Sequence, residues 1–157
     1  MKQWTRKTAA KFWNMPDNRV KYFVEYKKIV IPDKPGIGQG NPSYFNATNM
    51  VELGIAECLG RYGLAIGAIG AIQRVFKLLR VSNQEHKSIF ESWTEYDKLY
   101  LFIFGSGLLR QKNEFILWTH PKIDFHITEA KGKAAMKNSN SVLIIDLGSI
   151  FRKVKTA

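Results

Sequence analysis

Basic and aromatic side chains alternate along residues 17–28, and they are the groups of this chain best suited to chemistry with another molecule. They are Arg19, Lys21, Tyr22, Lys27 and Lys28. Arginine and lysine donate hydrogen bonds to phosphates and to guanine edges, and tyrosine offers a hydroxyl. The pattern favours recognition of nucleic acid, and the alternative is an ordinary solvated helix face.

The charge of the whole chain favours the same class of partner. Its 157 residues include 24 Lys and Arg against 13 Asp and Glu, a formal net charge of +11. Residues 1–46 hold nine basic and three acidic side chains, so this segment alone carries +6. Such a balance attracts polyanions, with nucleic acid first and an anionic membrane surface second. The apolar fraction of 45% is enough for a folded core.

Other kinds of site find little support in the sequence. Cys58 is the single cysteine, which excludes an intramolecular disulfide and a multi-thiolate metal site, and we expect it to be a small buried hydrophobe. The three histidines, His86, His120 and His126, lack a zinc-binding spacing, and no catalytic triad or carboxylate pair has a recognisable spacing. We therefore expect no catalytic residues, no metal and no cofactor, and we expect that the protein is not an enzyme.

Neither end of the chain nor its interior predicts a membrane protein. The opening M-K-Q-W-T-R-K has no apolar run and does not resemble a secretory signal. No stretch approaches the roughly 18–20 apolar residues of a membrane span. We expect a cytoplasmic protein without a membrane partner.

Two short helices joined by a tight corner must position the basic residues. Thr5 is suited to cap a helix over 6–13, because its hydroxyl can accept a hydrogen bond from an orphan N–H. Asn14 tolerates left-handed backbone angles and can end that helix. Pro16 and Asp17 then favour the start of a second helix over about 17–27.

Apolar spacing predicts how the next elements pack. Val20, Phe23 and Val24 form one stripe of the second helix and should face the core. A short apolar strand is expected at 29–31, and the Gly/Pro-rich run that follows, including G-I-G-Q-G at 36–40, predicts a hairpin tip or wing rather than a phosphate cradle. Asn46 should cap a third helix over 47–62, and a fourth is expected over 66–79. We expect Trp4, Phe12, Phe23, Leu53 and Ile69 in the core.

A short helix is expected at 82–94, and after it the residue pattern changes from helical to strand-like. Strands are predicted at 99–104, 114–119, 124–128 and 141–145, followed by a short helix at 147–155. The predicted fold class is therefore α+β, with a mostly α N-terminal winged helix-turn-helix and a small antiparallel β-rich C-terminal domain. The predicted domains are 1–80 for DNA binding, 81–97 as a linker helix and 98–157 for dimerisation or effector binding.

Residues 4–79 resemble the winged helix-turn-helix of the MerR transcription regulators. That family begins with Thr, four residues and Ala, then Gly-Val-Ser and a helix ending in Leu-Arg-Tyr-Tyr. This chain has, without a gap, Thr5, Ala10, Asn14-Met15-Pro16 and Val20-Lys21-Tyr22-Phe23. Lys21 stands at the position of the recognition-helix arginine, and Tyr22 stands at the first tyrosine.

The resemblance continues through the wing into the later helices. The family's Gly-Leu-Leu-x-Pro is similar to Lys28-Ile29-Val30-Ile31-Pro32, displaced by one residue. The exit from the wing resembles Phe45-Asn46 and Asn49-Met50-x-x-Leu53, and a later step resembles Y-G-L-A-I-G-A-I at 62–69.

The resemblance implies a DNA-binding transcriptional regulator that places helix 17–27 in the major groove and a Gly-rich wing on the backbone. Arg19 and Lys21 would approach base edges and phosphates, and Tyr22 would bond a phosphate. Further backbone contacts would come from Lys27, Lys28, Lys34 and Gln39. The implied partners are double-stranded DNA and a second copy of the chain, with an unknown small-molecule effector as a further candidate.

Departures from the family leave alternatives open. The family's wing arginine falls near Ser43, so a phosphate contact is missing or moved to Lys34 or Gln39. The long dimer-forming helix is absent or cut to 82–94, and residues 98–157 match no sensor domain of the family. The chain could instead be a protein-interaction or RNA-binding module with a ligand-binding β-domain. An enzyme within 98–157 is a third alternative, although so short a segment leaves little room for a pocket.

Overall fold

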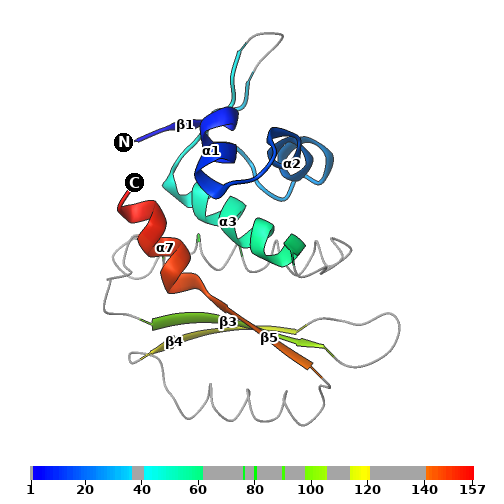
Figure 1. Cartoon of the computed structure of the whole chain (residues 1–157), viewed down its shortest axis with the longest axis vertical. Helices are drawn as coiled ribbons and strands as arrows, with labels where there is room; N and C mark the ends of the chain where they lie inside the picture. Colours follow the sequence, from blue (N-terminus) through cyan, green and yellow to red (C-terminus); the bar gives the residue numbers. More distant parts are fainter. Residues whose placement is uncertain are drawn as a thin grey trace. The chain divides into compact units, whose positions relative to one another are not determined.

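The computed structural model describes residues 2–36, 41–61, 98–105, 114–120 and 141–157, together with Phe76, Arg80 and Phe90. The protein is α+β, with helices and small antiparallel sheets (Figure 1). The chain divides into two compact units, one of residues 1–73 with 153–157 and the other of residues 74–152. The prediction of domains at 1–80, 81–97 and 98–157 stays a prediction.

Helix α1 (Arg6–Trp13) begins and ends as its sequence predicts. The Thr5 hydroxyl accepts a hydrogen bond from the backbone N–H of Thr8, which satisfies one of the orphan donors of the first turn. Asn14 adopts φ 51° and ψ 48°, the left-handed conformation that closes helices, and its N–H bonds back to Ala10 and Lys11. Met15 also donates to the Ala10 carbonyl at 3.0 Å, so the corner after α1 is fixed by backbone hydrogen bonds.

The second helix changes its hydrogen bonding along its length. Helix α2 (Asp17–Lys21) continues without a break into a π-helical turn, η1 (Tyr22–Tyr26). The N–H of Lys27 donates to the carbonyl of Tyr22 at 2.9 Å, a bond across five residues that is rare outside π-helical turns. Lys28 follows with φ 50°, and the chain leaves the helix there.

Buried side chains hold this helix down. Val20 and Phe23 are fully buried, whereas Val24 is half-buried. Ile29 and Val30 are buried as well, but they form no strand. The predicted strand at 29–31 is therefore wrong: the backbone N–H groups of both residues bond back to the Phe23 carbonyl, so they close the helix and do not pair with another strand.

A narrow hairpin follows the helical pair. Lys34 and Tyr44 exchange both backbone hydrogen bonds, at 3.2 and 2.8 Å, and the two described arms project away from α1 (Figure 1). The arms run so close together that a Cβ on Gly36 would collide with the Asn41 carbonyl, which explains the glycine. Strand β2 (Tyr44–Phe45) then pairs antiparallel with β1 (Trp4–Thr5), joining the hairpin to the start of α1.

Helix α3 (Ala47–Arg61) is the central support of the first unit. The Asn46 side chain accepts from the Asn49 N–H at 2.9 Å, as expected of a cap. Met50, Leu53, Ala56 and Leu59 are buried as predicted, and so are the polar Asn49, Glu52 and Glu57. The Asn49 amide accepts from the Asp33 N–H and donates to the Ile31 carbonyl, so it fixes the start of the hairpin to α3.

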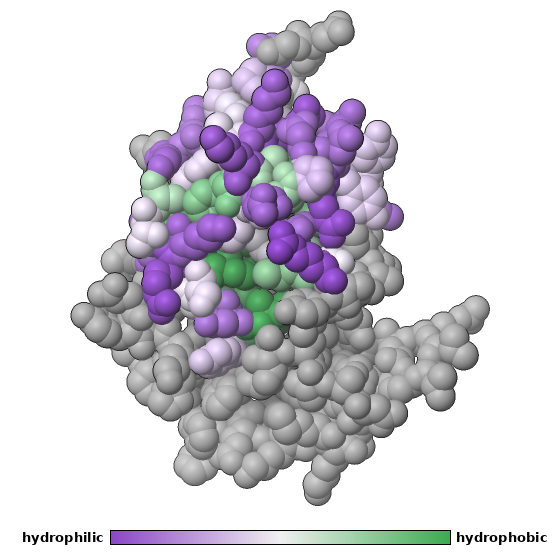
Figure 2. Space-filling model, viewed as in Figure 1, coloured by the Kyte–Doolittle hydropathy of each residue, from purple (hydrophilic) through white to green (hydrophobic). Residues whose placement is uncertain are grey.

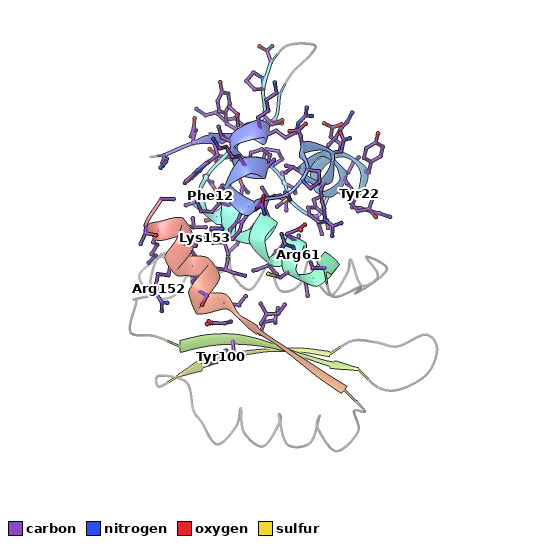
Figure 3. All side chains as sticks on the ribbon, in the orientation of Figure 1. Phe12, Tyr22, Arg61, Tyr100, Arg152 and Lys153 are labelled. Carbon is purple, nitrogen blue, oxygen red and sulfur yellow. The ribbon has the colours of Figure 1, made fainter. Side chains whose placement is uncertain are left out.

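Trp13 packs α1 onto α3. Its indole N–H donates to the Met50 carbonyl at 2.9 Å, and its six-membered ring lies over Gly54, where no side chain stands. Phe12 meets Trp13 edge to face with ring centroids 4.9 Å apart. Lys153 places its ammonium 4.6 Å from the centre of the Trp13 ring and 5.0 Å from that of Phe12 (Figure 3).

The described part of the second unit contains a three-stranded antiparallel sheet. Strand β3 (Lys98–Gly105) lies between β4 (Glu114–His120) and β5 (Ser141–Asp146). Helix α7 (Leu147–Lys155) follows directly, capped by the Asp146 carboxylate, which accepts from the Ser149 N–H. These strands and this helix confirm three of the predicted strands and the final helix, to within one residue at each end.

Several predictions concern residues outside the described part of the chain. They are Gln39, Ile69, most of the helices at 66–79 and 82–94, and the strand at 124–128. Phe76, Arg80 and Phe90 are helical, and both phenylalanines are buried.

Candidate nucleic-acid interface

The α2–η1 segment separates its buried residues from its basic and aromatic ones. Val20 and Phe23 face the core with no exposed surface, while Lys21, Tyr22 and Lys27 are half-exposed and Tyr26 is 70% exposed. Figure 3 shows Tyr22 on this segment. We call the outward set of Lys21, Tyr22, Tyr26 and Lys27 the α2–η1 face.

Ammonium groups lie over aromatic rings on this face. The Lys27 ammonium lies 5.5 Å from the centre of the Tyr22 ring, and the Lys21 ammonium lies 6.0 Å from that of Tyr26. Each pair is five residues apart. In an α-helix such residues are rotated by about 140° from each other, at ~100° per residue, and would not meet. The i→i+5 hydrogen bonding of η1 brings them onto a common face.

Acidic residues beside this face are neutralised by neighbouring cations. The Arg6 guanidinium lies 2.9 Å from Asp17 and 3.5 Å from Glu25. The Lys21 ammonium lies 3.8 Å from Glu25 as well. Exposed pairs of this kind contribute little to stability. Their consequence here is electrostatic, since both carboxylates of α2–η1 are compensated and the face remains positive.

Arg19 is directed elsewhere than Lys21 and Tyr22. Its Nε donates to the Glu57 carboxylate at 2.6 Å, and its guanidinium lies 5.5 Å from the centre of the Phe23 ring. The guanidinium also lies against Gly60, where a Cβ would collide with it. Arg19 therefore joins α2 to α3, and the structure does not bring it together with the rest of the predicted site.

Glu57 is the buried partner in this junction. Its second oxygen accepts from Arg61 Nε at 2.8 Å, so one carboxylate bridges two guanidinium groups. The hydrogen bond that Arg61 donates to Glu57 raises the pKa of Arg61, while burial raises the pKa of the neighbouring Cys58 thiol. Cys58 is half-buried, whereas the sequence predicted a small buried hydrophobic residue.

The remaining predicted contacts lie after the helix in the chain, at its end and on the hairpin. Lys28 is exposed at the left-handed residue that ends η1, and Lys34 is exposed on the first arm of the hairpin. Gln39 lies outside the described residues. Hydrophilic side chains cover much of the described part of the first unit (Figure 2).

Sequence reasoning missed two residues of this region. Tyr26 stands five residues after Lys21, a spacing that has no meaning on a regular α-helix, and only the π-turn brings the two together. Arg6 lies eleven positions before Asp17 on a different helix, and no periodic pattern connects them. The sole signal for either residue was its basic or aromatic type within a basic segment.

Some other kinds of site are not found in the described part of the chain. Over those residues, no group of three or more His, Cys, Asp or Glu side chains is arranged to hold a metal ion. No described helix is long and apolar enough to span a membrane. In comparisons with known proteins, no family model and no curated protein matched this chain.

Proposed function

We propose that the first unit binds double-stranded DNA as a MerR-like winged helix-turn-helix, and that the protein regulates transcription. The observation that carries the proposal is the α2–η1 face. A basic, aromatic helix is anchored by buried Val20 and Phe23 after a corner fixed by Asn14, with a protruding hairpin next in the chain. A helix held in this way can enter the major groove while the first helix braces against the backbone.

Two details of the second helix also support the likeness to the MerR regulators. The similarity to the family's Gly-Leu-Leu-x-Pro is displaced by one residue, and a π-turn accommodates one extra residue within a helix. Lys28 stands at the glycine of that motif, and it adopts the left-handed conformation for which glycine is the usual residue.

The roles within the proposed interface follow from the position of each side chain. Lys21 and Tyr22 approach base edges and phosphates from the centre of the helix. Lys27, Lys28 and Lys34 contact the backbone and set the salt dependence of binding. Arg19 forms an ion pair with Glu57 on α3 and so orients the helix from the side opposite the proposed interface. A homodimer on a near-palindromic site belongs to the same proposal, and an effector bound by the second unit is a further part of it.

The experiment that tests this function is selection of bound duplexes from a random library, followed by affinity titration and mass measurement of the complex. We expect affinity to fall steeply with salt, a selected sequence with two related half-sites, and two chains per site. Salt-insensitive binding to a protein, without affinity for any duplex, would favour the alternative of a protein-interaction module.

Substitutions in α2–η1 test whether this helix recognises the DNA sequence. Lys21→Ala combined with Tyr22→Phe should weaken binding to the selected duplex by about 1–3 kcal/mol for each side chain that reads a base, and should reduce selectivity over a scrambled duplex. Lys7→Ala on α1 removes one exposed lysine as well and is the charge-matched control. We expect Lys7→Ala to weaken binding to both duplexes equally. If the folded double variant keeps its selectivity for the selected duplex, α2–η1 is not the helix that recognises DNA.

A further inference from the structure

The aromatic side chain of Tyr26 does not pack into the core of the first unit. Its exposed fraction of 70% is unusual for so large a residue, and Ile31 at 60% is the other large hydrophobic residue exposed in the described part of the chain. Tyr22, by comparison, is half-buried against Phe23, with ring centroids 5.9 Å apart. Packing of the core therefore explains Tyr22 and leaves Tyr26 unexplained.

The charges around Tyr26 identify the kind of partner that fits it. Lys21 lies over the Tyr26 ring, and Lys27 follows directly in the chain. The adjacent carboxylate, Glu25, is paired with Arg6 and with Lys21. An exposed ring with Lys21 over it, a compensated acid before it and Lys27 after it in the chain offers a stacking surface with positive charge next to it, as single-stranded nucleic acids require.

The geometry of base pairs decides which part of a nucleic acid can use that ring. In an intact duplex the grooves present only the edges of bases, and the flat faces are covered by neighbouring bases. A tyrosine ring therefore stacks at least cost on a base that has left the helix, because insertion between paired bases must first unstack them. Such stacking depends little on which base it is.

We propose that Tyr26 stacks on an unpaired nucleobase, so that the α2–η1 face prefers DNA with an extrahelical base over fully paired DNA. Lys21 and Lys27 hold the phosphates on either side of that base. The inference rests on the proposed DNA-binding function and adds to it a preference for locally unpaired DNA.

The test compares two duplexes of the same mixed sequence, one fully paired and one with a single unpaired adenine at its centre. Affinities of the full-length protein for both are measured by fluorescence anisotropy at several salt concentrations. We expect the protein to bind the bulged duplex about 5- to 150-fold more tightly, the range that corresponds to one stacked base.

Three variants make the outcome specific to Tyr26. Tyr26→Ala should abolish the preference for the bulged duplex, while Tyr26→Phe should retain it because the ring remains. Ile31→Ala removes the other exposed hydrophobic side chain and should retain the preference as well. Both residues are exposed, so these substitutions leave the core intact, and circular dichroism checks that each variant is folded.

The failures of the two proposals are distinguishable. Salt-dependent binding of both duplexes with equal affinity would overturn the stacking role of Tyr26 and leave the proposed function standing. Equal loss of the preference in Tyr26→Ala and Ile31→Ala would also overturn that role. Absence of salt-dependent binding to either duplex would overturn both proposals.

Discussion

Replacing Gly54 by alanine tests how α1 is held on α3. An alanine Cβ at this position would stand 2.6 Å from Cζ2 and 2.7 Å from Cη2 of Trp13, closer than real Cβ atoms approach their neighbours. The indole would have to move away from α3, and its hydrogen bond to the Met50 carbonyl, 2.9 Å long, would be stretched or broken.

The expected change in the free energy of unfolding combines one favourable and two unfavourable contributions. Alanine in place of glycine within a helix is favourable by about 1 kcal/mol. Overpacking typically costs about 1–3 kcal/mol, and the hydrogen bond contributes about 1 kcal/mol. We expect Gly54→Ala to destabilise the protein by about 1–3 kcal/mol, although helix propensity alone predicts the opposite sign.

A double-mutant cycle with Trp13→Leu separates these terms. Leucine lacks the six-membered ring that would collide with the new methyl group, so in that background Gly54→Ala should stabilise by about 1 kcal/mol. Urea unfolding followed by circular dichroism measures the four free energies of unfolding. Gly60→Ala on the same helix probes a different contact, because there the new methyl group would displace the Arg19 guanidinium that bonds Glu57.

A change of sign between the two backgrounds is the decisive result. If Gly54→Ala stabilises the protein to the same extent with Trp13 and with Leu at position 13, the indole does not pack against Gly54 as described.

Three further predictions concern the helix ends and the cysteine. Lys28→Gly should raise the free energy of unfolding by about 1 kcal/mol because it relieves the left-handed strain, whereas Lys28→Ala, which removes the same charge, should not; equal effects in urea unfolding would refute the strain. Thr5→Ala should lower the free energy of unfolding by about 0.5–2 kcal/mol through loss of the cap, and Thr5→Ser should restore most of it, so a similar decrease in both variants would exclude the hydroxyl. Because burial raises the pKa of Cys58, the folded state holds the thiol proton more tightly than the unfolded state. This contribution to stability is therefore complete below the ordinary value of 9.0 and disappears as the pH rises above it. Iodoacetamide should accordingly label Cys58 more slowly than a free cysteine at about pH 8, and equal rates would contradict the protected thiol.

Local sequence rules predicted the first helical pair well. The cap at Thr5, the left-handed turn at Asn14 and the cap at Asn46 all depend on residues within four positions of one another, so the sequence contains the full cause. The sequence also predicted which residues of α3 are buried, because the residues of one buried helix face recur with the helical period.

The errors have a common origin in interactions that residue type and spacing do not reveal. Ile29 and Val30 read as a strand because they are apolar and β-branched, yet their N–H groups bond back to Phe23 and no strand forms. Arg19 read as an outward residue from its helical position, but Glu57 on α3, thirty-eight positions later, draws it inward.

By itself, the sequence determined the helix ends, the buried stripes and the concentration of positive charge in the first 46 residues, because these depend on residue type and short spacing. The tertiary structure decided which cations remain available to a partner. Glu57 engages Arg19 and Arg61, while Arg6 compensates Asp17 and Glu25. It also decided the π-turn that places Tyr26 beside Lys21, since a change in hydrogen-bond register alters which residues share a face and leaves no periodic trace in the sequence.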